Sequence, residues 1–186
     1  PIKAVYTGNL FIGRDKSLVR IVKAAECINR DSVKVKFDIY TSTELSDEIK
    51  NQLNCDYCEI HAPVPQQEVF EIQQKSDLML FVEDIDGPDA KVARLSFSTK
   101  ITDYLSSGKC IFAVGHKETA PMQYFINNDA AVIAAEDKEI EEKLSMLVNN
   151  PELLVKYAEN ARDIGVKNHN EEKILNTFNT VIKSVL

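Results

Sequence analysis

Short apolar runs alternate with longer amphipathic segments along most of the chain. Residues 78–82 form a continuous apolar run, which is typical of a strand buried on both faces. Residues 33–40 alternate apolar and polar side chains, which predicts a strand with one exposed face, near an edge of the sheet. The other predicted strands are residues 2–6, 57–61, 109–114 and 130–134.

Between these runs, apolar residues recur every three or four positions, which predicts helices with one buried face. The predicted helices are residues 17–28, 44–53, 66–75, 118–127, 137–149 and 171–185, with two more between Ser96 and Gly108 and from Pro151 onward. This alternation predicts an α/β fold, a Rossmann-like doubly wound parallel sheet of about six strands with a C-terminal helical tail. Ligands of such sheets bind at the carboxyl ends of the strands.

Composition narrows the class of partner. The 186 residues fit a single domain spanning 1–186, and the net charge of −7 argues against nucleic acid as the main partner. No apolar run approaches the roughly 18 residues that cross a membrane, and no signal peptide is visible, so we expect a cytoplasmic location. The chain begins with Pro1 rather than Met, and we expect it to be a piece of a longer protein.

Four cysteines, at positions 27, 55, 58 and 110, leave two interpretations open. Three of them lie in segments predicted to be buried, where a thiol acts as a small hydrophobic group, so we expect structural cysteines. Cys55 and Cys58 form a CxxC motif with His61 three residues later, which is the start of a metal or redox site. The sequence near this motif offers no fourth metal ligand at a suitable spacing.

Two stretches have chemistry suited to an anion. Residues 8–16 follow the first predicted strand and contain Gly8, Gly13, Arg14 and Lys16. Glycines let a ligand approach the backbone closely, and the two cations could neutralise a diphosphate. The alternative is a simple turn beside solvated surface charges. The chain has no GxGxxG motif after this strand, no GxxxxGK[ST] phosphate loop and no GxSxG motif.

The second stretch is the start of the helix that precedes Gly108. Ser96, Ser98 and Thr99 are residue types that cap helix N-termini, where free N–H groups and the helix dipole can hold a phosphate. Lys100 and Asp103 follow within the first two turns. We interpret the two stretches together as a site for a sugar nucleotide.

The order of these features resembles the C-terminal, donor-binding half of GT-B glycosyltransferases, especially glycosyltransferase family 4, group 1. Residues 98–111 (STKITDYLSSGKCI) are similar to the family pattern S-x-K-x-x-E-Y-L-A-x-G-x-P-V-I. Residues 6–9 (YTGN) resemble the opening strand and glycine turn, and residues 69–80 resemble the helix and strand before the pattern. Residues 149–153 and the region of Ala161 and Arg162 resemble the helical tail.

The resemblance implies transfer of a sugar from a nucleotide sugar to an acceptor, without a cofactor or bound metal. By position, it assigns Asp103 to the ribose hydroxyls. The residues that it places at the diphosphate, with Arg14 as a substitute for the family arginine, are Gly8, Asn9, Arg14, Lys16, Ser98, Thr99 and Lys100. The residues that it places beside the base are His61, Ala62, Pro63 and Val64.

The chain departs from the family pattern at several positions. Leu95 stands where the family has a glutamate that contacts the transferred sugar, Asp103 replaces the usual glutamate, and Leu10 stands where the family often has an arginine. Cys110 stands where proline is common.

The resemblance also implies an N-terminal domain of the same protein as partner, with the acceptor site and much of the catalytic machinery. We therefore expect a hexosyltransferase-type enzyme in bacterial surface polysaccharide synthesis, whose donor-binding half is inactive alone. Peripheral membrane association is possible through the N-terminal domain or a lipid-linked acceptor. The alternatives are a sugar-nucleotide epimerase half, a non-catalytic GT-B domain, and an unrelated doubly wound binding module.

Overall fold

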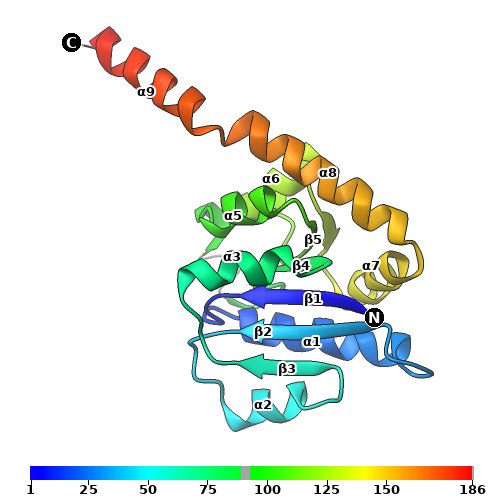
Figure 1. Ribbon diagram of the computed structural model, residues 1–186. Coiled ribbons are helices and arrows are strands. Elements are labelled where there is room, and N and C mark those ends of the chain that lie inside the picture. The colour runs from blue at the N-terminus through cyan, green and yellow to red at the C-terminus, as the bar shows by residue number, and fades with distance from the viewer. Residues whose placement is uncertain (89–92, 186) are drawn as a thin grey trace.

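The computed structural model describes residues 1–88 and 93–185. A six-stranded sheet, in which every neighbouring pair is parallel, runs through its centre (Figure 1). Its strand order is β3-β2-β1-β4-β5-β6. The strands are β1 (Ile2–Thr7), β2 (Val35–Tyr40), β3 (Cys58–His61), β4 (Leu78–Val82), β5 (Cys110–Val114) and β6 (Val132–Ala134).

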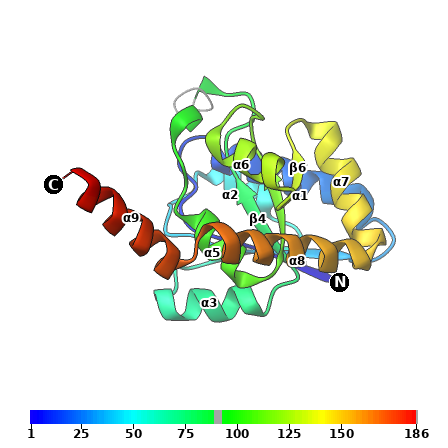
Figure 2. The same cartoon turned by 90° about the horizontal axis from the view of Figure 1, so that it is seen from above.

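Helices cover both faces of the sheet, which confirms the predicted doubly wound α/β class (Figure 2). One face packs against α1 (Arg14–Ile28), α2 (Asp47–Leu53) and α7 (Asp137–Asn149). The other packs against α3 (Gln66–Gln74), α5 (Lys100–Ser107), α6 (Ala120–Asn128) and α8 (Pro151–Asn168). A short 3-10 turn, η1 (Ala93–Leu95), precedes α5, and α9 (Glu171–Val185) ends the chain.

The continuous apolar run of β4 supplies side chains to both layers. Leu78, Leu80 and Val82 belong to the core against α1, whereas Met79 and Phe81 belong to the core against α5 and α6. Because successive strand residues point to opposite faces, a strand in the middle of a two-layered core must be apolar throughout.

Several predicted boundaries were wrong, and local backbone conformation and helix capping explain two of them. Helix α1 begins at Arg14 because Gly13 adopts a left-handed conformation (φ 71°) that lets the chain turn directly into the helix. Helix α2 begins at Asp47 rather than at the predicted residue 44, because the Oγ of Ser46 caps it by accepting from the N–H of Ile49. The predicted strand 33–40 begins at 35 and lies between β1 and β3, one position in from the edge.

The cysteines are free thiols. Cys110 is buried as expected, but Cys27 is exposed, so the prediction that it is buried was wrong. Cys55 and Cys58 lie across a turn at the start of β3, where the N–H of Cys58 donates to the carbonyl of Cys55. Burial raises the pKa of the Cys58 thiol to about 12, which keeps it protonated and weakly reactive.

Helix α9 extends away from the rest of the domain (Figure 1). Its apolar side chains, including Phe178 at 61% exposure, are therefore not covered by the core. Among the described residues, no helix is long and apolar enough to cross a membrane.

Candidate functional site

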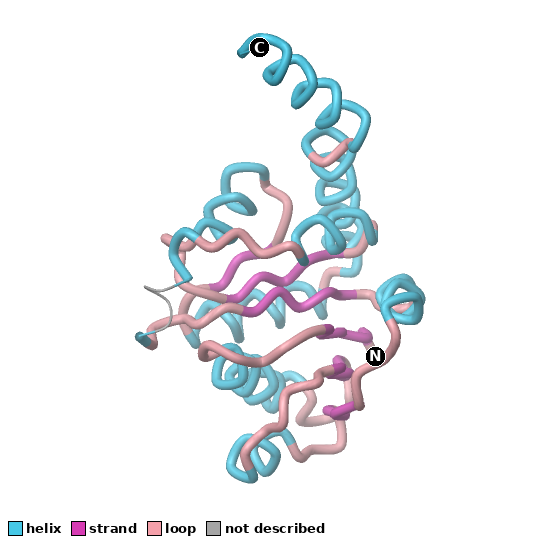
Figure 3. Tube along the Cα trace, turned by 90° about the vertical axis from the view of Figure 1, so that its left-hand side faces the viewer, coloured by secondary structure: helices cyan, strands magenta, loops and turns pink. Residues whose placement is uncertain are grey.

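The candidate site lies at the carboxyl edge of the sheet, onto which Figure 3 looks. From β1 the chain continues to β2 on one side, and from β4 it continues to β5 on the other. The strand order therefore reverses between β1 and β4, which is where open α/β sheets bind their ligands. The loop after β1, the loop after β4 and the start of α5 meet here, because Lys100 contacts Tyr6 and Arg14 contacts Glu83.

Gly8 closes β1 and lies directly against Lys100. Its N–H donates to the carbonyl of Tyr40 at 2.9 Å, and its φ of 129° is a conformation that L side chains rarely adopt. A Cβ atom added to Gly8 would overlap the Nζ and Cε atoms of Lys100. The glycine is therefore required both for the turn and for the approach of the lysine.

Lys100 is the first residue of α5 and is half-buried. Its Nζ donates to the hydroxyl of Tyr6 at 3.1 Å and lies 4.5 Å from the centroid of that ring. Burial, followed by the nearby cation of Arg14, lowers the pKa of Lys100 to about 8, and the carboxylate of Glu83 partly opposes this shift. The ammonium group is thus held with few compensating charges, a state that an added anion would stabilise.

Arg14 and Glu83 form a two-pronged ion pair beside Lys100. The Nε of Arg14 donates to Oε2 and its Nη2 donates to Oε1, both at 3.1 Å, and only 5% of the Glu83 side chain is exposed. Burial raises the pKa of Glu83, while Arg14 and then Lys100 lower it, with a net upward shift. Asp84, the next residue, is also buried.

The start of α5 is organised by one of the three predicted hydroxyl residues. The Oγ of Ser98 accepts from the N–H of Lys100 at 3.3 Å. Thr99 occupies the N-cap position in a helical conformation and makes no side-chain cap bond, and Ser96 is exposed. Asp103 lies one turn further along and is exposed, with its pKa raised by partial burial.

The remaining predicted phosphate residues lie around the cluster of Gly8, Arg14, Glu83 and Lys100 and make fewer contacts with it. Asn9 is exposed, and its Oδ1 accepts from the Oγ of Ser42 at 2.6 Å while its carbonyl accepts from Tyr6. Lys16 is exposed on the first turn of α1. The structure therefore brings Gly8, Arg14 and Lys100 together and leaves Asn9 and Lys16 at the periphery.

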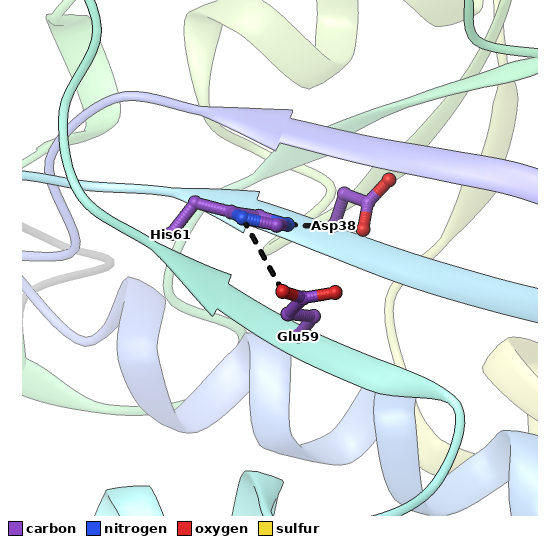
Figure 4. Close-up of side chains that lie close together, drawn as sticks. All are labelled: Asp38, Glu59 and His61. Atoms are coloured by element: carbon purple, nitrogen blue, oxygen red, sulfur yellow. Dashed lines mark hydrogen bonds and ion pairs between the residues drawn. The ribbon is translucent and has the colours of Figure 1, made fainter.

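The residues predicted to contact the base follow β3, two strands away from β1 on the same edge. Ala62 and Pro63 are exposed and Val64 is half-buried. His61 instead turns back along the sheet, stacks on Tyr40 at 4.4 Å between centroids, and contacts Asp38 through Nε2 at 3.1 Å (Figure 4).

The same group offers the donor atoms of a metal site. Asp38, Glu59 and His61 each place one ligand atom within 4.8 Å of the others (Figure 4). Glu59, however, approaches Nδ1 of the imidazole at 3.7 Å while Asp38 approaches Nε2, so the two carboxylates approach different nitrogens. The Nζ of Lys3 lies 3.0 Å from the Oδ2 of Asp38 and already supplies a cation there.

Sequence reasoning missed two residues that contact this cluster, Glu83 and Tyr6. Glu83 directly follows β4 and so falls on the ligand edge, but its acidic neighbours made the segment resemble a solvated turn. Only the fold shows that it is buried against Arg14.

Asp89, in the same acidic loop, lies outside the described residues. Leu95, at the family's glutamate position, is 89% exposed in η1.

Comparisons with known proteins identify the family. Residues 19–180 match the model of a family described as glycosyl transferase-like. A search of curated protein sequences finds no match. The sheet and its helices superpose on the C-terminal domain of the group 1 glycosyl transferase LpcC from Francisella tularensis, with a TM-score of 0.72 and 12% identity over 91% of this chain and 87% of that domain.

Two further structures have the same fold within longer chains. TarM from S. aureus, in a complex that includes UDP, gives a TM-score of 0.73 at 15% identity and covers 96% of this chain but 35% of its own. HepE from Anabaena, in complex with UDP-glucose, gives 0.73 at 11% identity, covering 98% of this chain and 49% of its own. The chain thus spans about a third to a half of the length of these relatives. Because the family match covers most of the sequence, the chain belongs to the glycosyl transferase-like family, and its fold is that of the C-terminal domain of GT-B, group 1 glycosyltransferases.

Proposed function

We propose that the chain is the donor-binding half of a glycosyltransferase and holds the diphosphate of a nucleotide sugar between the Gly8 turn and the start of α5. The observation on which the proposal rests is the contact of Lys100 with Gly8 and Tyr6 where the strand order reverses. This contact places a weakly compensated ammonium group beside the half-buried Gly8 and at the N-terminus of α5. An ammonium group and a helix N-terminus are both suited to phosphate oxygens.

In this proposal the chain contributes to catalysis by stabilising the leaving group. Charge develops on the diphosphate as the sugar departs, and Lys100, Arg14 and the N–H groups at the start of α5 would offset it. Asp103, one turn from Lys100, would accept from the ribose hydroxyls, and the segment from His61 to Val64 would lie beside the base. No metal or cofactor is needed for these roles.

We further propose that an N-terminal domain of the same protein supplies the acceptor site. Two observations support this partner. The chain spans only part of the length of TarM and HepE, and α9 presents uncovered apolar side chains beside a groove of about 650 Å³ at its base. Ile174, Phe178 and Val181 line that groove and are more than half exposed. Burial of these side chains by the second domain would remove them from water.

The biological setting is proposed from the same family. The full-length protein would be a cytoplasmic hexosyltransferase that acts in bacterial surface polysaccharide synthesis. The chain alone would bind donor but not transfer sugar. Any association with a membrane would occur through the N-terminal domain or a lipid-linked acceptor.

Isothermal titration of the chain with UDP, GDP and ADP tests donor binding and identifies the base. Lys100→Met is expected to weaken binding of the preferred nucleotide at least tenfold, because it removes a charge-assisted hydrogen bond to phosphate. Lys109→Met is the matched control, since Lys109 directly precedes β5, on the opposite edge of the sheet. Binding of none of the three nucleotides at millimolar concentration would favour an unrelated doubly wound module. Conversion of a nucleotide sugar without acceptor by the full-length protein would favour the epimerase alternative.

A further inference from the structure

Glu83 occupies one edge of the Arg14 guanidinium inside the proposed diphosphate site. Its two oxygens accept from Nε and Nη2, and its side chain is 5% exposed. A carboxylate and a phosphate bind guanidinium groups with the same two-pronged geometry. Glu83 therefore takes the position on Arg14 that a phosphate group would take.

The fold holds Glu83 in this position from the neighbouring strand. Its N–H donates to the carbonyl of Val114 at 2.8 Å. A Cβ atom added to Gly115, which follows β5, would lie 2.9 Å from the Cβ of Glu83, so the glycine leaves the space that Glu83 fills. The Glu83 carboxylate is thus held in place beside Arg14 by the fold and is not a mobile surface side chain.

The groups that face Glu83 come from every element around it. Arg14 belongs to α1, Lys100 to α5 and the buried hydroxyl of Tyr6 to β1, and Asp84 is the neighbour in sequence. Glu83 therefore compensates part of the charge of the two cations. A site with this balance attracts a diphosphate less strongly than Arg14 and Lys100 would alone.

We propose that Glu83 is an internal competitor of the diphosphate, and that the anion binds Arg14 fully only when Glu83 takes up a proton. The proton comes from solvent and converts the carboxylate to the neutral acid, which frees the Nε and Nη2 donors of Arg14 for phosphate oxygens. Glu83 thus sets both the affinity for diphosphate and its dependence on pH, with binding that tightens as pH falls. Its pKa, already raised by burial, agrees with this direction. The inference rests on the proposed function, because it assumes a diphosphate bound at Arg14 and Lys100.

Titration of UDP into the chain, in two buffers that differ in ionisation enthalpy, measures affinity and proton uptake together. Glu83→Gln keeps the shape and removes the charge. It is expected to bind UDP about tenfold more tightly. It should also take up about one proton fewer than the wild type, whereas protonation of UDP itself is common to both proteins. Asp86→Asn is the matched control, because Asp86 lies in the same loop but pairs with Arg20 at the surface, and a change within about twofold is expected.

Equal or weaker binding by Glu83→Gln would overturn the inference, and so would an equal gain with Asp86→Asn, because only net charge would then matter. If Glu83→Gln does not give a cooperative thermal transition, Glu83→Met, of similar volume, replaces it with the same expected gain. If the wild type binds UDP and Lys100→Met binds it more weakly, the proposed function is upheld whatever the affinities of the Glu83 variants. Absence of UDP, GDP and ADP binding in all variants would overturn both.

Discussion

Replacing Lys100 by methionine is expected to stabilise the chain while weakening its affinity for diphosphate. The ammonium group is buried against Tyr6 and Gly8 beside the cation of Arg14, and its pKa falls from the ordinary 10.5 to about 8. A difference of that size corresponds to about 3 kcal/mol against the charged form in the folded state. The cation–π contact and hydrogen bond to Tyr6 would offset about 1–2 kcal/mol of this. We therefore expect a net gain of about 1–2 kcal/mol at neutral pH.

The pH dependence makes the result diagnostic. Below pH 8 the lysine is protonated in both the folded and unfolded states, so the full cost of burying its charge is present. Between pH 8 and 10.5 the folded state releases the proton first, and the wild type gains stability that Lys100→Met cannot gain. Urea unfolding at neutral pH and near pH 10 measures this change, with Lys109→Met as a control expected to stay within about 0.5 kcal/mol. Destabilisation at neutral pH, or a difference that does not shrink at high pH, would refute the reasoning.

Three further outcomes follow from the same geometry. Affinity for UDP is expected to fall as pH rises through about 8, because Lys100 loses its proton, and titrations across that range should show a decline that Lys100→Met lacks. Gly8→Ala should destabilise the chain by about 1–3 kcal/mol in urea unfolding and weaken UDP binding. The φ of Gly8 is unfavourable for alanine, and the added Cβ would displace Lys100. An unchanged unfolding midpoint would contradict this prediction. Asp103→Asn should lower the affinity for UDP about fivefold and leave that for inorganic pyrophosphate unchanged, and equal losses for both would contradict a ribose contact.

The fold was largely predictable because its signals are local. The apolar run of residues 78–82, the helix of residues 137–149 and Gly108 at the end of α5 each specify one element through neighbours in the sequence. The error at the start of α2 arose where two capping residues competed. Thr43 and Ser46 are both suitable N-caps, and the choice was made by a tertiary contact, since the Oγ1 of Thr43 accepts from the N–H of Leu10.

The candidate site was less predictable because its key contacts join distant segments. Lys100 was assigned from a pattern around it, but its partner Tyr6 is 94 residues away, and Arg14 is 69 residues from Glu83. Nothing near Glu83 in the sequence indicates that it faces a cation. The strand order β1-β4 brings these pairs together, and that order is a property of the whole sheet.

The charges of Lys100, Arg14 and Glu83 link the stability of the domain to its proposed activity. Lys100 carries a depressed pKa because burial and Arg14 both disfavour its charge, while Glu83 restores part of it. Removing Glu83 would therefore leave two adjacent cations without compensation, which costs stability but favours an anion. A bound diphosphate would replace that compensation with a larger one. The Glu83 carboxylate thus offsets the repulsion between Arg14 and Lys100, and under the proposal the same carboxylate must be neutralised for a diphosphate to bind them tightly.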